Sequence, residues 1–247
     1  AGATPREVAA VTATSQRQGV VFLDAGGREV YAGPNLDLRA VFEGGAIDEE
    51  MRERVYYVTG HTPSFFFTPA KLRWFQIHRP DSYARIATVF SMADWLSWKL
   101  SGSISAERTL AAESGLLDLR SRDWATELYQ ELGLTIDSIR LVSAGDVVGE
   151  VSAARAAETG LAPGVPIVAA GADTQCGLLG LGVEGHGQGV ASGQSIEDAA
   201  HGCSPDVRRY RSLAELAHHQ VPAGGRLLEA VHLTLVAAEA VHRHIGG

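Results

Sequence analysis

Runs of apolar residues, each closed by a short polar break, predict buried strands in the first part of the chain. The run VAAVTAT at residues 8–14 predicts one strand, because continuous apolar stretches of this length are typical of strands buried on both faces. A second strand is predicted at residues 20–23. The turn at residues 24–27 (DAGG) then leads into a returning strand at residues 28–31, which completes a β-hairpin.

Amphipathic stretches farther along the chain predict helices, and capping residues set their limits. Three residues of N-capping type each precede such a stretch: Thr68 (followed by Pro69), Asp94 and Asp123. Residues that stop helices follow each stretch: Pro80, Gly102 and Gly133.

Two further strands are predicted between and after these helices. Residues 85–91 (RIATVFS) form the first, and residues 166–170 (PIVAA) form the second. The second is apolar throughout and lies between Gly164 and Gly171, a pattern typical of a central strand in a parallel sheet. Strands that alternate with helices predict an α/β fold.

Composition indicates a globular protein and argues against two classes of partner. The 247 residues include 21 Lys and Arg against 29 Asp and Glu, for a net charge of −8, and 45% are hydrophobic. We expect no nucleic-acid partner, because phosphates are bound by clusters of Lys and Arg. We expect no membrane partner either, since the longest apolar run, residues 165–172, is far shorter than the ~20 residues of a membrane span.

Cysteine, histidine and the first residue add three expectations. The two cysteines, Cys176 and Cys203, form no disulfide framework, which favours a reducing, cytoplasmic compartment. Six of the nine histidines lie from His201 onward, but their close pairs lack helical spacing, so we expect no metal site. The chain begins at Ala1 with neither Met nor a signal segment, so we expect that processing or truncation removed its start.

Asp173 is the first candidate for chemistry. It stands three residues after the strand at 166–170, and ligands of open α/β sheets collect beyond the carboxyl ends of strands. Two roles are open from the residues alone. The carboxylate could accept a proton from a bound hydroxyl group, or it could cap the helix that follows.

The second candidate is the polar break Gln16-Arg17-Gln18, which follows the strand at 8–14. Three long hydrogen-bonding side chains at a strand end suit a polyhydroxylated ligand, and a polar pocket of this kind discriminates strongly. The alternative is a solvent-facing connection, which the residues alone favour slightly.

Three other features have structural explanations. Asp37 and Arg39 are expected to form an ion pair on an extended stretch. Of the three aromatic residues at 65–67, which could stack on a sugar ring, at least two are expected in the core. The turn at residues 24–27 looks like an Asp-x-Gly-Thr phosphate loop, but Gly27 stands where the hydroxyl residue should be, so we interpret it as a turn only.

Seven segments taken together resemble the FGGY family of carbohydrate kinases. In chain order they are SQRQGVVFLD, PNLDLRA, TPAKLRW, ADWLSWKLSG, GLLDLRSRDW, GEVSAARAAETGLAPGVPIVAAGAD and TQCGLLGLG. Each is weak alone, but the series keeps the family's order over roughly residues 8–190. Within the family it looks most like the autoinducer-2 kinase branch and, after that, the xylulokinase-like branch.

The resemblance implies an α/β fold of the actin-like ATPase (ribonuclease H-like) type, in which two domains close on a sugar and ATP. It implies that Asp173 is the catalytic base and that Gln16, Arg17 and Gln18 contact the sugar. It places Phe66 near a pocket aromatic position and Thr174 beside the base. ATP and Mg²⁺ are the cofactors that it implies.

Two departures from the family pattern determine which domains we expect in this chain. The family's opening Asp-x-Gly-Thr strands have no counterpart here, and the segment expected to hold ATP phosphates contains Gly193, Gln194 and Ser195, with Gln in place of Thr. We therefore expect residues 1–188 to form an N-terminally truncated sugar-binding domain and residues 189–247 to begin a divergent ATP-binding domain.

Two functions follow from this resemblance. The first is an ATP-dependent carbohydrate kinase acting on a small sugar or polyol, of which this chain is an internal fragment unlikely to act unaided. The alternative is a non-catalytic sugar-binding or regulatory module derived from such a kinase. The sequence leaves open which sugar is bound and whether the protein is a homodimer.

Overall fold

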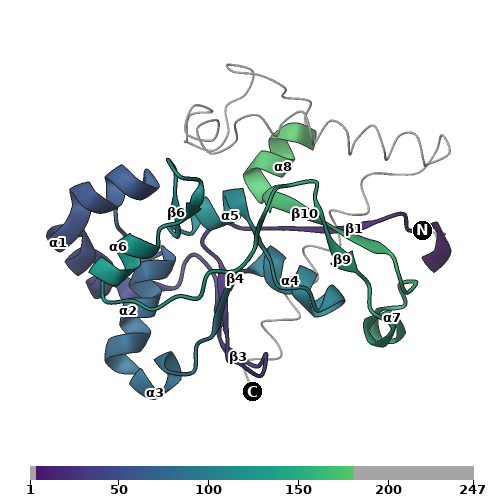
Figure 1. The fold of residues 1–247 in the computed structure, drawn as a ribbon, viewed down its shortest axis with the longest axis horizontal. Coiled ribbons are helices and arrows are strands. Elements are labelled where there is room, and N and C mark those ends of the chain that lie inside the picture. Colours follow the sequence, from purple (N-terminus) through teal and green to yellow (C-terminus); the bar gives the residue numbers. More distant parts are fainter. Residues whose placement is uncertain (1–3, 181–247) are drawn as a thin grey trace.

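The computed structural model describes residues 4–180 of the chain, as a mixture of short sheets and helices (Figure 1). Ten strands are described: β1 (Val11–Ser15), β2 (Val20–Leu23), β3 (Glu29–Gly33), β4 (Thr88–Ser91), β5 (Ala106–Glu107), β6 (Leu117–Asp118), β7 (Asp123–Trp124), β8 (Leu141–Val142), β9 (Val147–Glu150) and β10 (Pro166–Ala172). The described helices are η1 (Pro5–Glu7), η2 (Leu38–Ala40), α1 (Val41–Thr59), α2 (Thr68–His78), α3 (Pro80–Tyr83), α4 (Met92–Ser101), α5 (Arg108–Glu113), α6 (Thr126–Glu131), α7 (Ala153–Thr159) and α8 (Asp173–Gly180).

One sheet has the strand order β1–β10–β9, so the apolar strand β10 is central in it, as expected. β1 and β10 run parallel, with Val11 opposite Ile167 and Ser15 opposite Ala172. β9 pairs with β10 in the antiparallel direction, which makes the sheet mixed rather than purely parallel. β10 also continues through Gly171, two residues past the predicted end. The parallel pair is what brings two carboxyl ends to one edge.

A second sheet has the order β3–β2–β4, and its first two strands are the predicted hairpin. The turn is closed by Asp24, whose carboxylate accepts hydrogen bonds from the backbone N–H groups of Gly26 at 2.9 Å and Arg28 at 3.0 Å. The interpretation of residues 24–27 as a turn is therefore confirmed. All four residues of β2 are buried, and the Phe22 ring contacts Tyr31 and Phe75.

The helices gather on the two sides of this framework. α1, α2, α3 and α6 lie together at the left of Figure 1, where α1 packs against both α2 and α6. Their buried residues form the largest apolar core, which includes Ile47, Leu72 and Leu128. α4 contacts strands of both sheets and buries Leu100 in a second core with Val148 and Ile167.

All three predicted helix caps are wrong, each for a local reason. α2 begins at Thr68 itself, and the Thr68 hydroxyl is buried without a hydrogen-bond partner in the described structure. α4 is capped by Ser91, whose Oγ accepts from the Asp94 N–H at 3.1 Å, so Asp94 lies inside the first turn. Asp123 is in strand β7, and α6 starts after Ala125. The stops are confirmed for Gly102, which adopts a left-handed φ of 80°, and for Pro80, which starts a new helix.

Several expectations lie outside the described residues. These are the domain boundary at 188/189, the segment Gly193–Gln194–Ser195, Cys203 and the histidines from His201 onward. Within residues 4–180, no helix combines the length and the apolar character that a membrane span requires.

Candidate functional site

The two predicted sites lie together at the carboxyl ends of β1 and β10. Ser15 and Ala172 are opposite one another in the parallel pair, so the next residues of each strand are Gln16 and Asp173. Neighbouring strands are about 4.8 Å apart, which brings the two polar segments within reach of one small ligand. The arrangement is the one that open α/β sheets use for binding.

The segment Gln16-Arg17-Gln18 is a tight turn between β1 and β2. Gln18 has a φ of 58°, in the left-handed region that a non-glycine residue adopts only when neighbouring contacts hold it there. The contact is the ammonium of Lys71, which donates to the Gln18 carbonyl at 2.8 Å. The same Nζ donates to the Pro34 carbonyl at 3.2 Å and so joins this turn to the loop before η2.

Lys71 belongs to α2 and is completely buried, an unusual place for a lysine. Burial lowers the pKa of its ammonium to about 8, although the nearby Asp37 carboxylate favours the charged form. Asp37 also pairs with Arg39 at 2.7 Å, so the predicted ion pair is confirmed, although it sits at the start of η2 rather than on a strand.

Gln16 is held by contacts of its own. Its Nε2 lies 3.5 Å from the Met92 sulfur at the start of α4. Gly19 lets the Gln16 side chain approach closely, because a Cβ at that position would lie 3.0 Å from Gln16 Cγ. The side chain is therefore packed in a defined place rather than free in solvent.

Glu113, the last residue of α5, faces both of the other turn residues. Its Oε2 lies 3.5 Å from the Arg17 guanidinium and 3.3 Å from the Gln18 amide nitrogen. The Arg17 and Glu113 side chains are 21% and 15% exposed, so water screens the pair only in part. All three turn side chains are half-buried and have protein contacts, so they are neither free in solvent nor closed off from a ligand.

Asp173 is the first residue of α8 and is exposed. Its Oδ1 accepts a hydrogen bond from the Thr174 backbone N–H at 2.8 Å. That bond satisfies one backbone donor at the start of α8 and leaves the carboxylate accessible, so the capping and chemical roles are compatible. The Thr174 hydroxyl donates to Gln175 Oε1 at 2.8 Å.

Two half-buried side chains form hydrogen bonds at the ends of β1 and β10. The Thr14 hydroxyl donates to the Gly171 carbonyl at 2.7 Å, which ties β1 to β10 just before their ends. The Cys176 thiol also lies near this carbonyl, at 3.6 Å, and its burial raises the pKa of the thiol.

Glu107 and Asp94 form a buried acidic pair beneath α5. The Glu107 carboxylate caps α5 by accepting from the backbone N–H groups of Thr109 and Leu110, and burial raises its pKa. Asp94 Oδ1 accepts from the Glu107 N–H at 3.0 Å, and burial raises the Asp94 pKa to about 7. Glu107 thus fixes the first turn of the short helix that ends in Glu113.

Phe66 is half-buried and packs edge-on against Phe65 and at a tilt against Phe67. Of the three rings only Phe67 is buried, so the expectation of at least two core rings is wrong. Two residues later, the Thr68 N–H donates to the Ser114 carbonyl at 3.0 Å. This bond places the aromatic segment beside the end of α5, next to Glu113.

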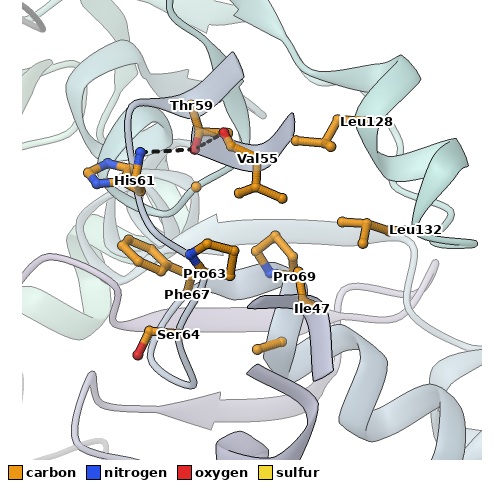
Figure 2. A pocket seen from close by; sticks show the side chains of 12 residues that line it. Ile47, Val55, Thr59, His61, Pro63, Ser64, Phe67, Pro69, Leu128 and Leu132 are labelled. Carbon is orange, nitrogen blue, oxygen red and sulfur yellow. Dashed lines mark hydrogen bonds between the residues drawn. The ribbon is translucent and has the colours of Figure 1, made fainter. Parts of the chain in front are cut away.

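A small cavity behind Phe67 is too small and too apolar to hold a sugar (Figure 2). Its volume is about 20 Å³, roughly the room that one water molecule needs. Ile47, Leu128 and Leu132 form much of the wall. The Thr59 hydroxyl is already bonded to the Val55 carbonyl and the His61 N–H, as the dashed lines of Figure 2 show.

Residues 4–180 contain no group of three or more His, Cys, Asp or Glu side chains placed to hold a metal ion. The segment expected to hold ATP phosphates, with Gly193, Gln194 and Ser195, lies outside the described residues. The carboxyl ends of β1 and β10 therefore carry the residues that the resemblance assigns to sugar binding, and the residues that it assigns to ATP phosphates are not among those described.

Comparison with known proteins identifies the family. The model of the N-terminal domain of the FGGY family of carbohydrate kinases matches residues 1–180. The chain belongs to the FGGY family of carbohydrate kinases.

Among characterised FGGY relatives, an autoinducer-2 kinase of Klebsiella pneumoniae is 38% identical over 192 residues, which is 76% of this chain and 36% of that protein. An autoinducer-2 kinase of Escherichia coli is 38% identical over 188 residues, or 74% of this chain and 35% of that protein. The chain thus spans about a third of the length of these relatives.

Solved structures of the family share the fold. A xylulose kinase from Rhodospirillum rubrum has a TM-score of 0.64 at 27% identity. The matched region is 72% of this chain and 38% of the xylulose kinase chain. A gluconate kinase from Lactobacillus acidophilus has a TM-score of 0.63 at 17% identity, and the matched region is 71% of this chain and 36% of the gluconate kinase chain. The expected α/β fold of the actin-like ATPase type is confirmed.

Two residues of the edge were missed by the sequence analysis. Lys71 lies inside TPAKLRW, where an amphipathic helix makes a lysine look like a solvent-facing residue. Glu113 closes the short helix α5, which has no apolar periodicity long enough to predict it. The burial of residues 68, 69, 70 and 72 around Lys71 is visible only in the structure.

Proposed function

We propose that this protein is an ATP-dependent carbohydrate kinase that transfers the γ-phosphoryl group to a hydroxyl of a small sugar or polyol. The observation that carries the proposal is the pairing of Ser15 with Ala172, which sets Gln16-Arg17-Gln18 beside Asp173. Membership of the FGGY family supplies the reaction class. Because the chain spans 36% of a relative's length, the activity is proposed for the protein as a whole.

In this proposal Asp173 is the catalytic base. Its exposed carboxylate takes the proton of the accepting hydroxyl while that oxygen bonds to phosphorus and ADP leaves with the electrons of the broken P–O bond. The Thr174 N–H bond to Oδ1 orients the carboxylate and leaves Oδ2 for the substrate. Holding the hydroxyl in line supplies most of the rate, since positioning dominates phosphoryl transfer.

The sugar-binding part of the proposal assigns Gln16, Arg17 and Gln18 to the substrate hydroxyls, with Thr174 beside them. Phe66 is assigned to one face of the pocket because its segment is tied to the end of α5. Autoinducer-2 and xylulose kinases are among the similar proteins, which makes small polyhydroxylated carbonyl compounds and their reduced forms the substrate class to test.

ATP and Mg²⁺ are proposed as cofactors by family, and residues Gly193, Gln194 and Ser195 are proposed to contribute to the phosphate site. Bound ATP supplies the phosphoryl group that the sugar accepts. A cytoplasmic location is also proposed. The alternative function, a sugar-binding module without transfer, is favoured by one observation, the Gln at position 194.

The test measures ADP formation and sugar binding on the whole protein, for which the activity is proposed. D-xylulose, xylitol and glycerol are offered with Mg-ATP, and binding is followed separately by calorimetry. Asp173→Asn should lower turnover by roughly 10²–10⁴-fold with little change in sugar affinity. Glu158→Gln, which removes a carboxylate of an exposed ion pair on α7, is the matched control.

Three outcomes separate the possibilities. Turnover that is lost only in Asp173→Asn supports the kinase and its base. Sugar binding without any ADP formation supports the binding module. Normal turnover in Asp173→Asn would show that Asp173 is not the base.

A further inference from the structure

In the described part of the chain, three charged side chains lie at or beside the ends of β1 and β10, and two of them are acidic. Arg17 carries the positive charge, while Glu113 and Asp173 carry negative charges. We propose that Glu113 is a specificity-determining residue, which engages the Arg17 guanidinium and thereby restricts the site to neutral polyols and ketoses. The inference rests on the proposed function, because it concerns the sugar that this edge accepts.

Glu113 contacts two of the three turn side chains that carry polar N–H groups. One carboxylate oxygen, Oε2, lies 3.5 Å from an Arg17 guanidinium nitrogen and 3.3 Å from Gln18 Nε2. Both charged side chains are about four-fifths buried or more, so their attraction is stronger than that of a surface pair. Arg17 is therefore engaged before any substrate arrives.

A free arginine at a sugar site would favour acidic sugars. The guanidinium fork binds carboxylates with two parallel hydrogen bonds, which is the strongest recognition of an aldonate that a side chain offers. With Glu113 in place, an incoming carboxylate meets a second carboxylate at the same guanidinium and a third at Asp173. Neutral hydroxyl groups meet no such repulsion, and they can donate to Glu113 as well as accept from Arg17.

A second positive charge near the turn, that of Lys71, is not available to a ligand. Lys71 lies beneath the same turn, but it is completely buried and its ammonium donates to the carbonyls of Gln18 and Pro34. No substrate carboxylate can reach Nζ without displacing one of these bonds. Among residues 4–180, the proposal therefore assigns the charge balance at the strand ends to Arg17, Glu113 and Asp173.

Glu113 is also held firmly enough to act in selection. It closes α5, whose first turn is fixed by the buried Glu107 carboxylate. The next residue, Ser114, accepts from the Thr68 N–H at 3.0 Å and donates its own N–H to Leu110 at 3.0 Å. The backbone that carries Glu113 is thus fixed from both sides, and the ion pair then orients the carboxylate.

The experiment compares xylitol with D-xylonate, which share one carbon chain and differ only in having a hydroxymethyl or a carboxylate end. Calorimetry on the 247-residue chain gives a dissociation constant for each. The wild type should bind xylitol at least tenfold more tightly than D-xylonate. Glu113→Gln, which keeps shape and removes charge, should reduce that preference by about tenfold or more, and Glu113→Ala should do the same.

Two controls assign the effect to the pair. Arg17→Met combined with Glu113→Gln should abolish the gain for D-xylonate, because the guanidinium that no longer pairs with the Glu113 carboxylate is its cause. Glu158→Gln, which removes a carboxylate from an arginine pair on α7, should leave the ratio unchanged.

The outcomes distinguish this inference from the function on which it rests. Xylitol binding with an unchanged ratio in both Glu113 variants overturns the role of Glu113 and leaves the sugar site intact. Equal wild-type affinity for the two ligands does the same. If the wild type binds neither these ligands nor any sugar of the kinase panel, the proposed function fails and the inference fails with it.

Discussion

Lys71 offers the sharpest prediction, because one buried ammonium holds the candidate site together. Substituting Met keeps most of the side-chain volume and removes both hydrogen bonds to the carbonyls of Gln18 and Pro34. Hydrogen bonds from charged donors contribute about 1.5–3 kcal/mol each, so the two contribute about 3–6 kcal/mol. The opposing cost is the burial of the charge, which lowers the lysine pKa from 10.5 to about 8 and amounts to about 3 kcal/mol.

The difference between these terms sets the expected loss of stability. At pH 7 Lys71→Met should lower the free energy of unfolding by about 2 kcal/mol, near the middle of the possible range of about 0–3 kcal/mol. Water can replace the amine at the Pro34 carbonyl, because Pro34 is exposed, which keeps the loss from the upper limit. Urea denaturation followed by circular dichroism measures it.

The pH dependence gives the same residue a second, independent signature. Between pH 8 and pH 10.5 the unfolded chain still holds the Lys71 proton that the folded chain has released, so the stability of the wild type rises with pH in this window. Below pH 8 both states are protonated and the contribution is constant. The gap between wild type and Lys71→Met should therefore widen by about 1.4 kcal/mol per pH unit from pH 8 toward pH 10.

The sequence provides a direct check on the lysine itself. Lys71 and Lys99 are the two lysines of the chain, so side-chain NMR titration has two amine signals to assign. The signal lost in Lys71→Met should titrate near pH 8. A gap between the variants that stays constant from pH 7 to pH 10, with that signal titrating at the value of a free lysine, would refute the buried-ammonium account.

Three further predictions follow from other parts of the fold. Gly44→Ala should destabilise the protein by about 1–3 kcal/mol, because a Cβ there would lie 2.5 Å from the Phe65 backbone nitrogen. Gly45→Ala, where a Cβ would have nothing within 4 Å, should stabilise α1 by about 0.5–1 kcal/mol. Thermal melts that rank the two variants in the other order would contradict the close approach. The wild type should lose stability as pH rises from about 4 to about 7, because the raised pKa of Asp94 lets the folded chain hold a proton that the unfolded chain has released. Asp94→Asn should remove this decline. Urea melts of both proteins at pH 5 and pH 8 measure it. Phe22→Ala should cost about 3–5 kcal/mol, because the ring is fully buried against Tyr31 and Phe75, and a loss below about 1 kcal/mol would show that this core is loosely packed.

Apolar patterning predicted β1, β2, β3, β4 and β10 but missed the strands from β5 to β9. It was most accurate where burial on both faces leaves little choice of residue. β2 and β10 were found nearly residue for residue, and the hairpin turn at Asp24 followed from its own turn chemistry. Helix starts were predicted less well. Asp94 is a residue type that often caps helices, but here the Ser91 hydroxyl accepts from the Asp94 N–H and is the cap. A local sequence pattern does not show which of two such residues caps the helix.

The candidate site shows a similar division between local and long-range information. Gln16, Arg17, Gln18 and Asp173 were predicted because each follows a recognisable strand. Lys71 and Glu113 were not, because their roles arise from contacts 53 and 95 residues away in the chain, both to Gln18. Burial of a lysine and the direction of a short helix are set by tertiary packing, which periodicity does not report.

The central claim is that a sugar binds where β1 and β10 end. Amide NMR spectra of the 247-residue chain, recorded while xylitol is added, test it most directly because they locate the ligand on the backbone. We predict that the largest shifts fall on residues 16–18, 113–114 and 173–175, with saturation at one dissociation constant. Shifts that cluster instead around the apolar cavity at Val55, Thr59 and Phe67, or spectra that do not change at saturating xylitol, would contradict the account.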